Sequence, residues 1–142
     1  MRVSEILRHK GADVIVISPS ATVEELVALL SRHNLGAVVV SEDGSAVTGL
    51  VSERDVIRHL ADGTAVLNQQ VSTIMSSTVH TCGAGDSVES LMGVMTEQRV
   101  RHLPVLAEDQ RLCGIVSIGD VVKSTITQLE FERDQLQGYV TS

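Results

Sequence analysis

Aromatic side chains are nearly absent from this sequence of 142 residues, which has one Phe, one Tyr and no Trp. Proteins that hold single-stranded nucleic acid usually stack its bases on aromatic side chains, so this shortage argues against a nucleic acid partner. We expect a core built from Val, Ile, Leu and Met. Any base that binds must therefore be held by aliphatic side chains and backbone groups.

Positive charge is also scarce, because 11 Lys and Arg stand against 18 Asp and Glu and leave a net charge of -7. A surface of this sign repels nucleic acid and anionic membranes as a whole. A small phosphorylated ligand can still bind where a few basic side chains gather. The charge balance therefore favours a small-molecule partner over a polyanion or a membrane.

Long apolar runs are missing as well. No stretch approaches the roughly 18 residues of a membrane span, and residues 1–5 lack the apolar run of a signal peptide. We therefore expect a cytoplasmic protein whose two cysteines, Cys82 and Cys113, stay reduced. Apolar residues still make up 43% of the chain and charged residues 20%, as in ordinary folded domains.

The sequence repeats itself at an offset of about 65 residues. The matches are Val14 with Val79, Thr22 with Ser87, Val23-Glu24 with Val88-Glu89, Leu26 with Leu91, Val40 with Val105, Gly49 with Gly114, Val51-Ser52 with Val116-Ser117 and Asp55-Val56 with Asp120-Val121. Upstream, Val3 matches Val71 if three residues are dropped from the second copy. We therefore predict repeat 1 over residues 1–64, repeat 2 over residues 65–125 and a helical tail over residues 126–142.

Each copy predicts the element order βαββα. In the first copy we expect strands at 14–17, 37–40 and 47–51, a hairpin turn at 42–45, a helix from Thr22 with Leu26, Leu29 and Leu30 on one face, and a second helix with Val56, Ile57 and Leu60 inward. In the second copy the first helix carries Val88, Leu91, Met92 and Met95. Three-stranded sheets of this size are marginal alone. The predicted fold is thus α/β (α+β), with two pseudo-symmetric units packed as one module.

The tail from Ser124 to Tyr139 reads as a further helix. Ile126, Leu129 and Leu136 recur at near-heptad spacing and are surrounded by charged residues. This apolar stripe either covers its own module or pairs with a second chain, and the pattern alone does not decide between the two.

The sharpest shared motif is an apolar strand that ends in Gly-h-Val-Ser-x-x-Asp, where h is apolar, at residues 49–55 and 114–120. Ser-x-x-Asp ahead of an apolar helix is a capping box, which contributes about 1 kcal/mol and implies no ligand. The same turn can also form an anion site, because free helix N–H groups and the Ser hydroxyl can face a phosphate. The Asp carboxylate can then accept the hydroxyls of a ribose.

Two observations favour the binding interpretation of this motif. It occurs twice at equivalent positions, and a cation follows each Asp by one helical turn, as Arg58 after Asp55 and Lys123 after Asp120. Helical side chains lean toward the N-terminus of the helix, so both cations can reach a phosphate that sits there.

The doubled βαββα unit with this motif resembles a tandem cystathionine-β-synthase (CBS) domain pair, also called a Bateman module. The strand Arg101-His102-Leu103-Pro104-Val105 adds to the resemblance, which extends from about Val3 to Lys123. The resemblance implies a regulatory protein without catalytic residues or a required cofactor. It implies binding of AMP, ADP, ATP or NAD(H) in clefts between the repeats, association into a homodimer, and control of another protein that the sequence does not identify.

The resemblance also assigns roles to individual residues. Asp55 and Asp120 would hold the ribose, and Ser52 and Ser117 would face the phosphate. Adenine would lie against backbone groups of Ile17, Ser18 and Cys82, and would be covered by Val39, Val40, Pro104 and Val105. The candidate phosphate partners are Arg54, Arg58, Arg101 and Lys123, and His102 is a further ligand-binding candidate. Because Gly36-Ala37 in one copy corresponds to Arg101-His102 in the other, we expect the two clefts to differ in ligand or affinity.

Two other functions compete with this one. His80, Cys82, His102 and Cys113 all fall in the second copy and would form a metal or thiol site, but they lack Cys-x-x-Cys or His-x-x-x-His spacing. Neither Cys follows a turn that would place it at a helix N-terminus as a nucleophile. The other competitor is a ligand-free interaction scaffold that works through the tail helix.

Overall fold

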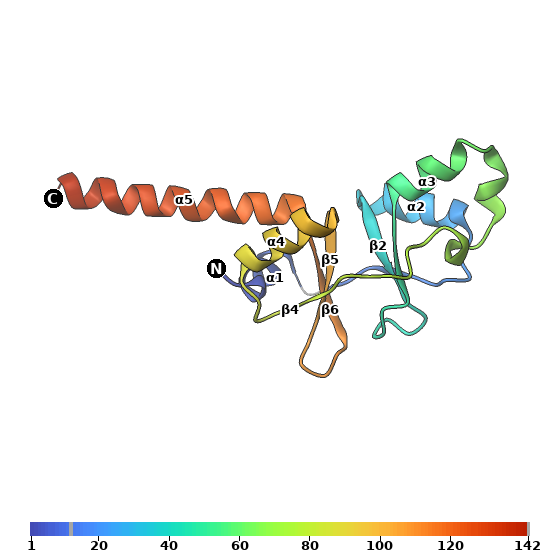
Figure 1. Cartoon of the computed structure of the whole chain (residues 1–142), viewed down its shortest axis with the longest axis horizontal. Helices are drawn as coiled ribbons and strands as arrows, with labels where there is room; N and C mark the ends of the chain where they lie inside the picture. Colours follow the sequence, from blue (N-terminus) through green and yellow to red (C-terminus); the bar gives the residue numbers. More distant parts are fainter. Residues whose placement is uncertain (12, 142) are drawn as a thin grey trace.

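The computed structural model describes residues 1–11 and 13–141, so residues 12 and 142 of the predicted repeat 1 and tail lie outside it. Two small sheets lie side by side, with their helices on the outer sides (Figure 1). The first unit comprises β1 (Val16–Ile17), α2 (Val23–His33), β2 (Ala37–Val40), β3 (Gly49–Ser52) and α3 (Glu53–Leu60). The second comprises β4 (Cys82–Gly83), α4 (Val88–Gln98), β5 (His102–Leu106), β6 (Leu112–Ser117) and α5 (Ile118–Thr141). The predicted mixed α/β fold is confirmed.

Three further elements precede or connect these units. The N-terminal helix α1 spans Val3–Lys10, and the short 3-10 helices η1 (Thr64–Asn68) and η2 (Val71–Thr73) lie between the two units. None of the helices in the described part of the chain is long and apolar enough to cross a membrane.

Both sheets have the same topology, in which the middle strand pairs in parallel with the first strand and antiparallel with the third. Ile17 pairs with Val40 in the first sheet, and Cys82 pairs with Val105 in the second. These pairs keep the offset of the sequence repeat, so the repeat and the hairpins are confirmed. Two strands begin later than predicted: β1 begins at Val16 instead of residue 14, and β3 begins at Gly49 instead of residue 47.

The helices that follow the first strands begin with a side-chain cap, and each is followed by a residue in the left-handed conformation, Asn34 or Arg99. Thr22 Oγ1 accepts a hydrogen bond from the Glu25 backbone N–H at 3.1 Å, and Ser87 Oγ accepts one from Ser90 at the same distance. These hydroxyls satisfy N–H groups that have no partner within the helix. The duplication therefore extends to the helix ends.

The leading segment of each copy packs on the other copy's sheet. The core behind the first sheet includes Val66, Val71 and Ile74, which begin or precede the second copy. The core behind the second sheet includes Val3 and Ile6 of α1. The two units thus exchange their leading segments, and the packing crosses the sequence boundary that we predict at residues 64–65.

The exchange explains the glycine of the shared motif. A Cβ at Gly49 would lie 2.6 Å from Met75 Sδ and 2.9 Å from the Ser76 carbonyl oxygen, and one at Gly114 would lie 2.6 Å from a methyl carbon of Leu7. Larger residues would therefore collide with the arriving segment. The motif glycines are thus the points where the exchanged segments pass over the sheets.

Part of the predicted core is wrong. In α3 only Val56 is buried, whereas Ile57 is 65% exposed and Leu60 is 38% exposed. The space beside this eight-residue helix is filled by η1, whose Val66 enters the core. Met92 of α4 is likewise exposed, although its neighbours Leu91 and Met95 are buried.

The tail helix is confirmed, but it does not cover its own module. It continues without a break from the last helix of the second unit to form α5, which extends away from both sheets (Figure 1). Ile126, Leu129 and Leu136 are all more than half exposed. The interpretation of the apolar stripe as a cover for the same module is therefore wrong.

The exchange of segments predicts that α1 stabilises the second unit. We expect Ile6→Ala to lower the free energy of unfolding by about 2–5 kcal/mol, because the substitution leaves a cavity in that core. Urea denaturation followed by circular dichroism measures this value. The control is Arg8→Ala on the exposed side of the same helix, which should stay within about 0.5 kcal/mol of wild type. Equal effects of the two substitutions would show that α1 is not part of the core.

Candidate functional site

The candidate site lies where the last strand of each sheet meets the following helix. In the first copy, Asp55 Oδ2 accepts the Ser52 backbone N–H at 2.8 Å, and Ser52 Oγ accepts the Asp55 N–H at 3.3 Å. In the second copy, the matching distances for Ser117 and Asp120 are 2.9 Å and 3.1 Å. Both predicted capping boxes are therefore present, and they fix each carboxylate at the start of its helix.

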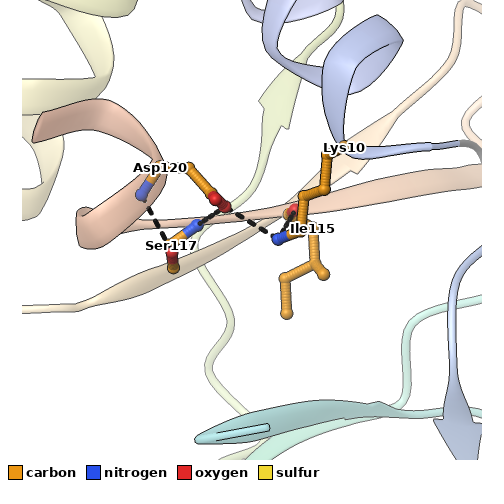
Figure 2. Close-up of polar contacts among 4 residues, drawn as sticks. All are labelled: Lys10, Ile115, Ser117 and Asp120. Carbon is orange, nitrogen blue, oxygen red and sulfur yellow. Dashed lines mark hydrogen bonds and ion pairs between the residues drawn. The ribbon is translucent and has the colours of Figure 1, made fainter. Parts of the chain in front are cut away.

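The second carboxylate has an additional partner from the exchanged helix α1. Lys10 Nζ donates to Asp120 Oδ2 at 2.7 Å and to the Ile115 carbonyl oxygen at 2.9 Å (Figure 2). Within residues 1–11 and 13–141, no Lys, Arg or His pairs with Asp55. The two copies therefore differ in charge at the same position.

The ion pair changes the acidity of Asp120. Burial raises the pKa of this carboxyl, but the hydrogen bonds from Lys10 and from the Ser117 N–H outweigh that effect and hold the pKa below its usual value of 3.8. Asp120 therefore stays ionised across the physiological range of pH.

A cleft of about 370 Å³ opens between α1 and α5 beside this ion pair. It is lined by Met1, Glu5, Ile6, His9, Lys10, Asp120, Lys123, Ser124 and Thr127. Of the predicted site residues, Asp120 and Lys123 line this cleft. Its walls come from both sequence copies, because α1 belongs to the first and α5 to the second.

A second cleft, of about 520 Å³, lies at the opposite end of the second sheet. Among the predicted site residues, only Cys82 lines it. It is bordered by Leu106 and by the loop at Ala107, whereas Ser117 pairs with His102 at the far end of β5. Ser52 and Asp55 line neither of these two clefts.

The predicted adenine residues divide between the two faces of each sheet. Because strand side chains alternate, Val39 faces away from the core that holds Val38 and Val40. By the same rule, Pro104 faces away from the core that holds Val105. Val40 and Val105 can therefore contact a ligand outside the cores only through backbone groups.

The remaining predicted residues lie at the first strand and on the surface. Ile17 is a core residue, and exposed Ser18 hydrogen-bonds to the Ser20 hydroxyl at 2.9 Å. The cations Arg54, Arg58 and Arg101 are exposed and form no ion pair within the described ranges. They are therefore accessible to an anion.

His102 lies where the two units meet. A Cβ at Gly36 would be 3.8 Å from the His102 ring and 3.7 Å from Glu53 Oε1, so this histidine lies against the first unit. Burial, aided by the nearby charge of Lys10, lowers the pKa of His102 against the opposing effects of Asp120 and Glu53. The ring is therefore neutral at physiological pH and can both donate and accept a hydrogen bond.

The thiol and metal alternative gains no support from the geometry. The part of the chain that the structure describes has no group of three His, Cys, Asp or Glu side chains placed to hold a metal. Burial raises the pKa of the Cys82 thiol to about 12, and burial also raises that of Cys113. Neither thiol is thus activated as a nucleophile.

Comparison with known proteins identifies the family. The sequence profile of the CBS domain matches this chain twice, at residues 3–62 and 71–126. The chain belongs to the CBS domain family. It is 31% identical, over 97% of its length and 71% of the relative, to the mitochondrial CBS domain-containing protein CBSX3 of Arabidopsis thaliana.

Solved CBS structures have the same fold. A CBS-domain protein of Agrobacterium tumefaciens is 40% identical, with a TM-score of 0.84 over 88% of this chain and 99% of that one. A CBS domain protein of Pyrobaculum aerophilum, solved in complex with AMP, is 27% identical, with a TM-score of 0.75 over 84% of this chain and 89% of that one.

Lys10 is the site residue that sequence reasoning missed. It lies 110 positions from Asp120 in the chain, at the end of a helix that local pattern assigns to the other copy. The only signal in the sequence is the match of Val3 with Val71, which marks the leading segments as equivalent but does not show that they are exchanged.

The Lys10–Asp120 pair predicts a pH-dependent contribution to stability. Because the folded pKa of Asp120 lies below the unfolded value, the contribution is complete above about pH 4 and is lost as the pH falls through the folded pKa. We expect Lys10→Gln to cost about 1 kcal/mol near pH 7 and progressively less below about pH 4. Urea denaturation at pH 7 and at about pH 3 measures the difference. The control is Arg8→Gln, on the exposed side of α1 and outside the cleft. A cost that does not change with pH would contradict the assignment.

Proposed function

We propose that this CBS domain pair is a non-catalytic regulatory module that binds an adenine nucleotide, with AMP as the first candidate. The main observation that supports this proposal is the duplicated Ser-x-x-Asp turn. It presents an oriented carboxylate and a hydroxyl at the start of α3 and of α5. The AMP complex of the Pyrobaculum relative supports the choice of ligand. ADP, ATP and NAD(H) remain the other candidates.

Capping and ribose binding are compatible because they use different oxygens of the carboxylate. Both Asp55 and Asp120 accept their capping bonds through Oδ2. Among the described residues, neither Oδ1 atom accepts a hydrogen bond that would have to be broken. A ribose hydroxyl can therefore donate to Oδ1 while the helix cap stays intact.

The other parts of the nucleotide site are assigned from the similarity to CBS domain pairs. Val39 and Pro104, on the sheet faces turned away from the two cores, are the apolar side chains assigned to adenine, and backbone groups of Ile17 and Ser18 are assigned to its edge. Cys82 lies in the other cleft, at the far end of the second sheet from Asp120. The hydroxyls of Ser52 and Ser117 face the phosphate. Arg54, Arg58, Arg101, His102 and Lys123 supply further donors.

Regulation follows if the ligand favours one arrangement of the two units. Each unit completes its core with the other's leading segment, so a shift at a site between them is transmitted to both cores. We propose that an unidentified protein responds to this change, either directly or through a change in the association of two copies.

Each of the two sites should depend on its own carboxylate, Asp55 or Asp120. Isothermal titration calorimetry with AMP should detect saturable binding to the wild type, which the double substitution Asp55→Asn and Asp120→Asn should abolish. Asn keeps an oxygen for the cap but removes the second acceptor for the ribose diol. Asp62→Asn, on the exposed loop after α3, is the control.

A thermal shift panel of AMP, ADP, ATP, NAD and S-adenosylmethionine then ranks the ligands. At about 100 times Kd, a bound ligand stabilises the protein by about 2.7 kcal/mol. The proposal fails if no member of the panel binds, or if the double variant retains the affinity of the wild type.

A second candidate function, an interaction scaffold, is favoured by α5. Val122, Leu129 and Leu136 are spaced by seven residues, as are Ile126, Arg133 and Val140, and the apolar members of both rows are at least half exposed. The two rows form a heptad seam of the kind that pairs helices. Two parallel copies would oppose their Arg133 side chains, whereas antiparallel copies would place each against a leucine. We therefore propose an antiparallel pair of α5 helices as the homodimer contact.

The scaffold candidate predicts that the seam determines the oligomeric state. Light scattering after size exclusion should find a wild-type dimer, and Leu129→Glu with Leu136→Glu should produce a monomer, because charges in a seam are costly. Gln128→Glu with Gln135→Glu adds equal charge beside the seam and should leave a dimer. A wild-type monomer, or a dimer that survives the leucine substitutions, would exclude α5 as the contact.

A further inference from the structure

We propose that Lys10 makes the site of the second repeat selective for phosphorylated nucleosides, by binding the phosphate while it remains paired with Asp120. The inference rests on the proposed function and adds a specificity residue that comes from the exchanged helix α1. It concerns the second site only, and the first site, which lacks this lysine, serves for comparison.

The hydrogen bonds of Lys10 leave one donor for a ligand. An ammonium group has three N–H donors. One is given to Asp120 Oδ2 at 2.7 Å and a second to the Ile115 carbonyl oxygen at 2.9 Å (Figure 2). Lys10 also lines the cleft between α1 and α5, with 35% of its side chain exposed. The third donor can therefore bind an anion without the loss of either existing bond.

The charges around the cleft fit a phosphate beside a sugar. Its charged or titratable side chains are Glu5, His9, Lys10, Asp120 and Lys123. Lys10 and Lys123 balance the carboxylates of Asp120 and Glu5, so these four side chains carry no net negative charge that would repel a phosphate. A phosphate adds a second anion for Lys10, whereas adenosine offers none. Lys10 thus contributes more to the binding of the nucleotide than to that of the nucleoside.

The first site has no equivalent cation. Leu7 approaches Gly114 as Met75 approaches Gly49, so Leu7 and Met75 occupy equivalent places on the exchanged segments. Three residues further along, Lys10 corresponds to Thr78. Thr78 carries no charge, and its carbonyl oxygen accepts a hydrogen bond from the Ser76 hydroxyl at 3.1 Å. The two sites should therefore discriminate differently between AMP and adenosine.

The test measures affinities for AMP and adenosine by calorimetry. The second site is isolated in an Asp55→Asn background, in which Lys10 is unchanged or replaced by Gln or Arg. With Lys10 present, AMP should bind more tightly than adenosine. Lys10→Gln should weaken AMP binding roughly tenfold, as expected for a hydrogen bond to a charged group, and leave adenosine within about twofold. Lys10→Arg keeps a cation and should retain most of the preference.

Arg8→Gln is the matched control, because it removes the same charge from the exposed surface of α1 outside the cleft. Circular dichroism at the titration temperature verifies that each variant is folded. Equal weakening of AMP and adenosine by Lys10→Gln would mean that Lys10 only positions Asp120, and would overturn the inference. Unchanged AMP affinity would overturn it as well. In both cases the proposed function survives, whereas failure of AMP to bind the unsubstituted protein would overturn both.

Discussion

The exchange of leading segments is the contact on which the rest of the structure depends. Three strands and two helices form each unit, and each core is completed by apolar residues that arrive from the other copy: Val3 and Ile6 on one side, Val71 and Ile74 on the other. Burial of these side chains holds the units together, because small sheets do not bury enough apolar surface alone. The exchange also brings Lys10 to Asp120 and makes the copies chemically unequal.

The same Ser and Asp side chains form the helix caps and the candidate site. A capping box holds each Asp in a fixed orientation, and that orientation leaves Oδ1 available beside the Ser hydroxyl. A site that is preorganised in this way loses little conformational entropy when a ligand binds. The capping interpretation and the binding interpretation of Ser-x-x-Asp therefore do not exclude each other. Stability changes in Asp variants must be measured alongside affinity.

The sequence was sufficient to predict what local pattern and duplication encode. The strand pairing of Ile17 with Val40 and of Cys82 with Val105 follows the repeat offset, and Thr22 begins its helix as expected. Long-range packing was not predictable, because nothing near Lys10 shows that its helix crosses to the other sheet. Long-range packing also explains why Ile57 is exposed. The helical period predicts that Ile57 enters the core, but Val66 of η1 packs there. The sequence also does not show which face of each sheet is turned away from the core. The strand register is needed to place Val39 and Val40 on opposite faces.

The most direct test of the central claim is a crystal structure of the protein with AMP. The account predicts a ribose whose hydroxyls donate to Asp55 or Asp120 Oδ1 while the Ser52–Asp55 and Ser117–Asp120 caps remain intact. At the second site it further predicts the phosphate within hydrogen-bonding distance of Lys10 Nζ. A nucleotide bound away from both carboxylates, or bound only after a cap has opened, would contradict it.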